Sequence, residues 1–200
     1  MDRFDAPELL DLNVGTLADA AESLGDLRRI NRWLGGTRAL THHLLPRVAA
    51  AARASSRTVV VADIGTGSAD IPIALVRWAR RRGIPLQVLA VDLNQRHLAL
   101  ARPGLAAYPE VRLVAAEGGN LPWRDGVDYI VASLFLHHFP PADVVGLLRG
   151  WYATARRGVI ANDLIRAWLP YLGYFALRPF IARARPSTPS RIREECTKVK

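Results

Sequence analysis

Apolar residues recur at helical spacing in the first quarter of this 200-residue chain. Between residues 7 and 55 they return every three or four positions, which is typical of amphipathic helices. Asp26 is a candidate N-cap for a helix through residues 27–34, and the glycine pair at 35–36 predicts its end. A second helix is predicted over residues 37–53. The positions that define the first pattern are Ala18, Ala21, Leu24, Leu27, Ile30 and Leu34.

From residue 58 onward the pattern changes to short, β-branched apolar runs that alternate with helical segments. Such runs are typical of strands buried on both faces of a parallel sheet. The alternation predicts right-handed βαβ crossovers and an α/β fold, a doubly wound, Rossmann-like, mostly parallel sheet of about five strands with helices on both faces. The predicted strands are residues 58–64, 86–92, 111–116, 128–133 and 158–163. The first predicted helix follows the turn at 65–67 and ends at residue 82, and the second starts after its cap, Asn94, and ends at residue 102. The last two predicted helices are residues 142–155 and 164 to about 184.

These elements divide one domain into three parts. Residues 1–55 are expected to form an N-terminal helical segment, or lid, and residues 56–184 the ligand-binding core. The tail 185–200 holds both lysines and the single cysteine of the chain, whereas the cation elsewhere is arginine. This change in composition predicts a tail that is disordered or aberrant.

Composition and charge exclude several classes of protein. Half of the residues are hydrophobic, one cysteine provides no disulfide framework, and the first 15 residues lack the pattern of a signal peptide. No apolar run reaches the roughly 18 residues of a membrane helix, so we expect a soluble, cytoplasmic protein without a membrane span. The net charge of +9 forms no stripe of cations and aromatic residues, so no nucleic-acid partner is expected.

The first predicted strand ends in a turn that suits a ligand. Gly65 and Gly67 permit a tight turn and a close approach of the ligand to the backbone, beside the unpaired N–H groups of a helix N-terminus. Asp92 ends the next strand, where a carboxylate can accept both hydroxyls of a ribose. A strand, this turn, a helix and a second strand that ends in an acid predict an adenosine-containing ligand.

Two further acids near the turn indicate which ligand this is. Asp63 precedes the first glycine, and Asp70 stands where the third glycine of a dinucleotide fingerprint belongs. Two carboxylates repel a pyrophosphate but suit an ammonium and a sulfonium, and attraction of a few kcal/mol at about 4 Å is enough to decide between the two. S-adenosylmethionine therefore fits better than NAD, and a nicotinamide-dependent oxidoreductase remains the alternative.

At these residues the chain resembles the class I S-adenosylmethionine-dependent methyltransferases, in particular the small-molecule branch similar to ubiquinone and menaquinone biosynthesis enzymes. The matching segments are DIGTGSAD at 63–70, VDLN at 91–94, EGGNLPW at 117–123, DYIVASLFLHHF at 128–139 and GVIANDL at 158–164. The resemblance implies that Gly65 and Gly67 flank the methionine portion, that Asp92 holds the ribose and that Glu117 faces the adenine. The cofactor-binding residues expected on this basis are Asp63, Gly65, Thr66, Gly67, Asp70, Asp92, Leu93, Glu117, Gly118 and Ser133.

The expected reaction is methyl transfer to a small hydrophobic or aromatic acceptor. His137 and His138 follow the fourth strand and are candidate bases for an oxygen nucleophile. Trp33 and Arg38 are candidate lid residues, and the apolar segment 164–181 is a candidate wall of the acceptor pocket or a point of peripheral contact with a membrane. No metal site is expected.

The end of the chain bears on activity. The resembled class continues after the fifth strand and its helix with an antiparallel hairpin, and no alternating apolar run that could form it follows residue 184. A missing hairpin would leave the fifth strand as an exposed edge, which predicts self-association and weak turnover. A catalytically silent methyltransferase-like protein is therefore a further alternative.

Overall fold

The computed structural model describes residues 15–33, 35–55, 57–123 and 126–163. The helices are α1 (Leu17–Trp33), α2 (Gly36–Ala54), α3 (Asp70–Arg80), α4 (Gln95–Ala101) and α5 (Pro141–Thr154), with two short 3-10 helices, η1 (Arg102–Leu105) and η2 (Leu136–His138). The strands are β1 (Val59–Ile64), β2 (Leu86–Asp92), β3 (Val111–Ala115), β4 (Val127–Ser133) and β5 (Ala155–Asn162).

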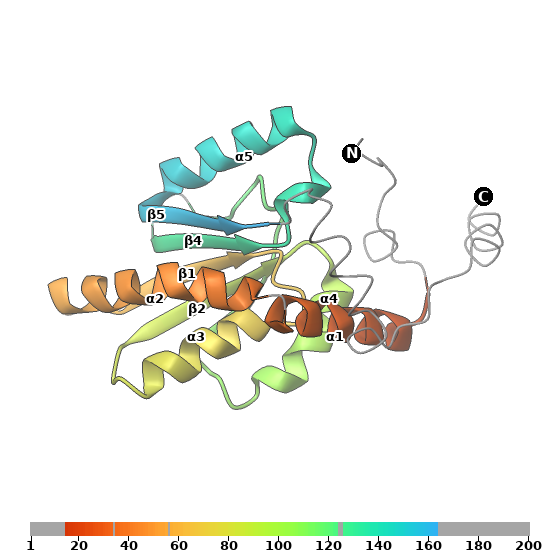
Figure 1. Ribbon diagram of the computed structural model, residues 1–200, viewed down its shortest axis with the longest axis horizontal. Helices are drawn as coiled ribbons and strands as arrows, with labels where there is room; N and C mark the ends of the chain where they lie inside the picture. Colours follow the sequence, from red (N-terminus) through yellow and green to blue (C-terminus); the bar gives the residue numbers. More distant parts are fainter. Residues whose placement is uncertain (1–14, 34, 56, 124–125, 164–200) are drawn as a thin grey trace.

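The five strands form one parallel sheet in the order β3-β2-β1-β4-β5 (Figure 1). This order follows from two sets of crossovers that leave β1 in opposite directions, so that helices cover both faces. The predicted doubly wound α/β fold is therefore confirmed. Because all strands run the same way, their carboxyl ends meet at one edge of the sheet, beside the switch point between β1 and β4, where ligands bind in such folds.

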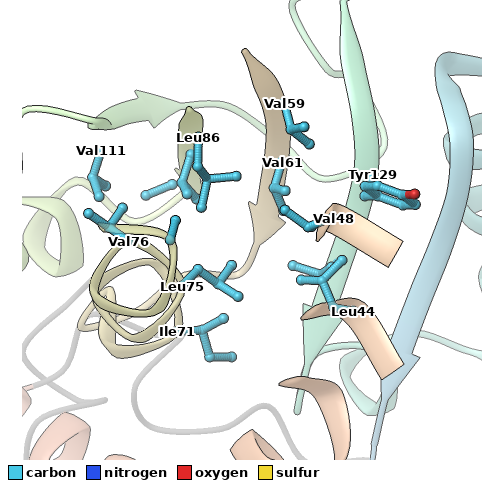
Figure 2. Packing of buried hydrophobic residues seen from close by; sticks show 14 of the residues in the cluster. Leu44, Val48, Val59, Val61, Ile71, Leu75, Val76, Leu86, Val111 and Tyr129 are labelled. Carbon is cyan, nitrogen blue, oxygen red and sulfur yellow. The ribbon is translucent and has the colours of Figure 1, made fainter. Parts of the chain in front are cut away.

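The larger hydrophobic core lies between the sheet and helices α2 and α3. Leu44 and Val48 of α2 face Val61 of β1, and Leu75 of α3 packs into the same cluster (Figure 2). All four side chains are almost completely excluded from solvent. Burying each contributes on the order of 1.5–3 kcal/mol, so this face fixes the position of β1 and of the turn that follows it.

The opposite face of the sheet is covered by α5. Trp151 is buried against a smaller cluster that includes Ile64 and Ile130, the alternate residues of β1 and β4. Its indole N–H donates a hydrogen bond of 2.7 Å to the carbonyl of Gly118 in the loop after β3. The bond satisfies the polar atom of a buried indole and ties α5 to a loop at the carboxyl edge of the sheet.

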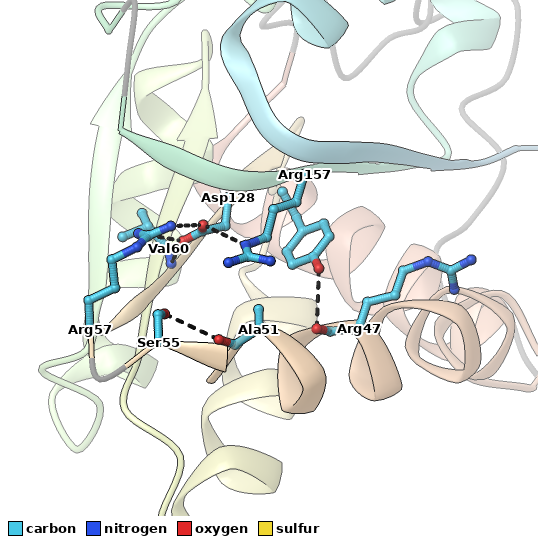
Figure 3. A network of polar contacts seen from close by, with 8 residues as sticks. Arg47, Ala51, Ser55, Arg57, Val60, Asp128 and Arg157 are labelled. Atoms are coloured by element: carbon cyan, nitrogen blue, oxygen red, sulfur yellow. Dashed lines mark hydrogen bonds and ion pairs between the residues drawn. The ribbon is translucent and has the colours of Figure 1, made fainter. Parts of the chain in front are cut away.

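An ion-pair network holds the amino ends of the central strands together (Figure 3). The buried Asp128 of β4 accepts a hydrogen bond of 2.9 Å from the backbone N–H of Val60. The guanidinium of Arg57 contacts both carboxylate oxygens, and Arg157 Nε of β5 lies 3.2 Å from Oδ1. One carboxylate therefore bridges β4, β1 and β5 at the edge opposite the turn.

The first helix corrects one prediction. Asp26 lies inside α1 and pairs with Arg29 one turn later, so it is not the N-cap. The helix begins instead beyond Thr16, whose N–H donates to Asp19 Oδ2 at 2.8 Å while the Asp19 N–H donates to the Thr16 hydroxyl at 3.2 Å. This reciprocal pair is a capping box, and it extends the helix by ten residues, or nearly three turns, toward the N-terminus.

The other predicted elements agree with the structure to within about three residues, with β5 beginning at residue 155 rather than 158. The predicted helix after residue 163 and the tail lie outside the described residues, and so does the segment in which a hairpin was expected to be missing. Self-association stays a prediction.

Candidate functional site

The turn after β1 adopts the conformation that its glycines allow. Gly65 has φ 71° and Gly67 has φ 51°, in the left-handed region that side chains disfavour. Between them, the Thr66 N–H donates 2.9 Å to the carbonyl of Val91 in β2. A Cβ on Gly65 would collide with the ring of Phe135, so the space beside this glycine admits no side chain.

Asp92 is held against this turn by backbone hydrogen bonds. Its Oδ2 accepts 2.9 Å from the N–H of Gly67, and its Oδ1 accepts 2.8 Å from the N–H of Asn94. Asn94 then caps α4 by accepting a bond of 3.0 Å from the Arg96 N–H, which confirms the predicted cap. The carboxylate at the end of β2 therefore has a fixed orientation, and each of its oxygens keeps further acceptor capacity for a ligand hydroxyl.

Asp63, the last but one residue of β1, is only 2% exposed. Its Oδ2 accepts a hydrogen bond of 2.7 Å from the Thr66 hydroxyl. Burial, with smaller contributions from the nearby carboxylates Asp70 and Asp92, raises the pKa of Asp63 to about 8 despite that bond. Burial also raises the pKa of Asp70, against a 3.1 Å bond from the Ser68 hydroxyl.

The three acidic side chains Asp63, Asp70 and Asp92 determine which ligand charge the site accommodates. Without a cation nearby, Asp63 is mostly protonated at neutral pH, because its charged form would be desolvated and would face two like charges. A ligand with an ammonium and a sulfonium compensates that repulsion, whereas a pyrophosphate adds to it. The donor set at the turn therefore fits S-adenosylmethionine and does not fit a dinucleotide.

Helix α1 lies over the turn near the carboxyl ends of the strands (Figure 1). A Cβ on Gly67 would stand 3.3 Å from Cδ2 of the buried Leu24. About two turns further along the same helix, Asn31 Oδ1 lies 3.5 Å from the Ser133 hydroxyl at the end of β4. This hydroxyl also accepts a hydrogen bond of 3.1 Å from Asn162 Nδ2 of β5. Leu24 and Asn31 are seven residues apart and share one face, so α1 covers the site through these two side chains.

The lid residues expected from the sequence do not make these contacts. Trp33 is 75% exposed, and Arg38 is exposed as well. Leu24 and Asn31 were not predicted as lid residues, although a polar residue such as Asn31 on the apolar face of a helix was a usable signal.

The loop after β3 and the turn after β1 both contact one aromatic ring, that of Phe135 in the loop after β4. Phe135 was not predicted as a site residue. A Cβ on Gly118 would lie 2.8 Å from Phe135 Cζ, so the Phe135 ring lies against both Gly65 and Gly118. Leu134, with φ 55°, turns the chain after β4 so that this ring enters. The structure thus brings the β1 turn, the loop after β3 and the loop after β4 into one region.

The remaining predicted cofactor residues surround this region in different environments. Glu117 is exposed, and Leu93 is 69% exposed beside Asp92, which leaves an apolar side chain available to a flat ligand. Gly118 is buried and accepts the Trp151 bond. Ser133 is engaged with two amide side chains, so it borders α1 and β5 rather than the glycine turn.

The two predicted bases lie in the loop after β4. Asp163, which directly follows β5, accepts a 2.7 Å contact from His137 Nδ1 and a 3.0 Å hydrogen bond from the His137 backbone N–H. The rings of His137 and His138 lie 4.3 Å apart. Sequence reasoning placed Asp163 at the end of a strand but gave it no role.

None of the helices within the described ranges is long and apolar enough to cross a membrane. The same part of the chain holds no group of three or more His, Cys, Asp or Glu side chains arranged to hold a metal ion.

Comparison with solved structures shows the same fold. A Methanococcus maripaludis protein described as an S-adenosylmethionine-dependent methyltransferase matches with a TM-score of 0.56 and 15% identity over 84% of this chain and 74% of its own. Magnesium protoporphyrin IX methyltransferase from Synechocystis, solved with S-adenosylhomocysteine bound, matches with a TM-score of 0.55 and 16% identity over 82% of this chain and 73% of its own.

Other similarities cover less of the chain. An Aquifex aeolicus methyltransferase matches at 21% identity and a TM-score of 0.42, and the match covers 49% of this chain and about half (51%) of that one. No curated protein sequence matches the chain. Residues 61–158, which contain the turn, Asp92 and the loop after β4, match the family model described as a methyltransferase domain. Residues 61–158, just under half of the chain, therefore match a methyltransferase domain, within a fold that the chain shares with solved S-adenosylmethionine-dependent methyltransferases.

Proposed function

We propose that the whole chain transfers a methyl group from S-adenosylmethionine to a small hydrophobic or aromatic acceptor. The observation that carries the proposal is the cluster of Asp63, Asp70 and Asp92 around a glycine turn. Three carboxylates in a partly buried site leave a cation as the ligand that they stabilise best. The cofactor supplies a methyl group on a positively charged sulfur.

Seven of the ten predicted cofactor residues take part in the proposed site. Asp92 accepts the ribose hydroxyls, because the N–H groups of Gly67 and Asn94 fix its carboxylate and leave lone pairs unused. Gly65 and Gly67 let the methionine portion approach the backbone, and Asp63 and Asp70 face its ammonium. Leu93 and Glu117 are assigned to the adenine, one as an apolar surface and one as a hydrogen-bond acceptor.

The proposed acceptor is small and flat, similar to the phenols and quinols of the ubiquinone and menaquinone branch. Support comes from the aromatic surface of the loop after β4, where the Phe135 and Phe139 rings lie 5.1 Å apart. Methyl transfer in this site needs alignment of the acceptor and exclusion of water more than covalent help. Helix α1 covers the site through Leu24 and Asn31 and supplies that exclusion.

A transfer assay tests the proposal. The chain is incubated with S-adenosylmethionine that carries a labelled methyl group and with a panel of phenols, quinols, carboxylic acids and amines. We expect label in at least one extractable product, and much less of it with Asp92→Ala when the cofactor concentration is near the wild-type Kd. Binding of S-adenosylhomocysteine without transfer to any acceptor would favour the catalytically silent alternative.

A further inference from the structure

We propose that Asp163 is a positioning residue that sets His137 as the base for an acceptor hydroxyl, which makes the reaction an O-methylation. The inference rests on the proposed function and narrows its acceptor to a weakly acidic hydroxyl, such as a phenol. It also distinguishes between the two histidines of the loop after β4.

The contact between the two residues fixes the imidazole in one orientation. Asp163 Oδ1 lies 2.7 Å from His137 Nδ1, and Oδ2 accepts 3.0 Å from the His137 backbone N–H. One carboxylate therefore holds both the ring and the main chain of the same residue. Because an ionised carboxylate only accepts hydrogen bonds, the neutral imidazole carries its proton on Nδ1 and its basic lone pair on Nε2.

The pair lies at the same edge of the sheet as the glycine turn. Ser133 at the end of β4 pairs with Asn162, the residue before Asp163, and Ala132 pairs with Ile64, the residue before Gly65. The Phe135 ring, which packs on Gly65, lies 6.3 Å from the His138 ring, and this ring lies 4.3 Å from His137. A row of rings therefore connects the turn to the base.

The chemistry of the step follows from this tautomer. The acceptor hydroxyl gives its proton to His137 Nε2, and an oxygen lone pair forms the new bond to the methyl carbon. The carbon–sulfur bond breaks, and its electron pair turns the sulfonium into a neutral thioether. Asp163 stabilises the imidazolium, which then releases its proton to water. An amine would use its own lone pair, so a base held this way favours a phenolic hydroxyl, whose pKa is near 10.

The first test is nuclear magnetic resonance of the ligand-free, ¹⁵N-labelled full chain. We expect neutral His137 to be protonated on Nδ1 in the wild-type chain, because the carboxylate of Asp163 accepts a hydrogen bond from that nitrogen. Asp163 and His138 are two titratable groups that lie against the His137 ring. Protonation on Nε2 in the wild-type chain would overturn the proposal without any variant.

The second test uses kinetics with a phenolic acceptor. We expect His137→Gln to lower kcat about a hundredfold or more and Asp163→Asn about tenfold or more, with KM within about twofold. The wild-type kcat should rise with pH through the pKa of His137, and this rise should vanish in His137→Gln. Asp143→Asn, which neutralises an exposed acid in the first turn of α5, is the matched control for charge and should keep the wild-type profile.

The outcomes separate this inference from the proposed function. Unchanged kcat in folded His137→Gln, or transfer to amines but not to phenols, overturns the role of the pair while methyl transfer stands. If Asp163→Asn does not fold, Asp163→Ser and the wild-type tautomer decide. No binding of S-adenosylhomocysteine by the wild-type chain overturns the proposed function, and the inference falls with it.

Discussion

Asp92 Oδ2 accepts a hydrogen bond of 2.9 Å from the backbone N–H of Gly67, so the acid that ends β2 is also part of the turn after β1. The bond explains why these two features occur together in the chain. The carboxylate shapes the turn and presents its remaining lone pairs at the same point. A substitution at Asp92 therefore changes both the conformation of the turn and its affinity for a ligand.

The Asp92→Ala substitution tests this double role. We expect the loss of a charge-assisted contact of about 1.5–3 kcal/mol, which weakens binding of S-adenosylhomocysteine roughly tenfold to a hundredfold. Calorimetry measures the affinity. Asn94→Ala is the control, because it removes the cap of α4, worth about 1 kcal/mol of stability, and leaves the carboxylate in place. Equal affinity in wild type and Asp92→Ala would reject the ribose contact.

Gly65→Val tests the turn itself. The substitution places a β-branched side chain at φ 71° and against Phe135, so we expect cofactor binding to be abolished. Gly83→Val is the matched control, since Gly83 also has positive φ, 61°, but open space around its Cβ position. Both variants should lower the melting temperature, and only the first should lose binding. Normal binding by a folded Gly65→Val chain would show that the turn has no role in the ligand site.

The raised pKa of Asp63 leads us to expect a cofactor affinity that depends on pH. Its pKa is raised to about 8 by burial, so at pH 7 the carboxyl group must lose its proton to face a cation. We expect the binding of one S-adenosylmethionine to release nearly one proton at about pH 7 and almost none at about pH 9. The affinity for the cofactor should therefore rise between these two pH values. Calorimetry in buffers of different ionisation enthalpy counts these protons. Asp63→Asn should release none, and equal counts in both proteins would contradict the assignment.

The same group affects the stability of the ligand-free chain. In the unfolded chain this carboxyl group loses its proton near its ordinary pKa of 3.8, whereas the folded chain keeps the proton until about pH 8. The contribution of Asp63 to the free energy of unfolding therefore falls as pH rises from about 4 to 8 and is constant above that range. We expect Asp63→Asn to exceed the wild type in stability at pH 8 but not at pH 4. Urea unfolding at both pH values measures the difference.

Removing or protonating Asp128, at the opposite edge of the sheet, is expected to lower the stability of the chain. Burial alone would raise its pKa, but the bond from the Val60 N–H and the guanidinium of Arg57 together lower it. Its contribution is thus present above its unfolded pKa and is lost as pH falls through the folded value. We expect Asp128→Ala to cost about 2–4 kcal/mol in urea at pH 7, because a buried N–H and two cations lose their partner. Asp143→Asn should stay within about 0.5 kcal/mol of the wild type.

The sequence predicted the strands because each is a short, buried, β-branched run between clear breaks, as Val59–Ile64 shows. The predicted cofactor residues at the turn also lie together, since Gly65, Gly67 and Asp92 are at the carboxyl ends of two adjacent strands. The start of α1 was wrong because Asp26 is a plausible cap locally, while Thr16 and Asp19 form a better, reciprocal one.

Contacts between segments that are distant in the sequence could not be predicted. The approach of Phe135 to Gly65 depends on the left-handed conformation of Leu134, which its residue type does not suggest. The pairing of Asp163 with His137 depends on the register of β4 with β5, which sets the two loops side by side. Neither relationship has a local pattern, so a single sequence does not reveal it.

Competitive calorimetry with the wild-type chain tests most directly whether the turn and Asp92 form an S-adenosylmethionine site. The protein is titrated with S-adenosylhomocysteine, with S-adenosylmethionine and with NADH at one pH and ionic strength. We predict saturable binding of the first two at a single shared site, and no binding of NADH, because its pyrophosphate meets the acidic cluster of Asp63, Asp70 and Asp92. Saturable binding of NADH, with none of S-adenosylhomocysteine, would contradict it.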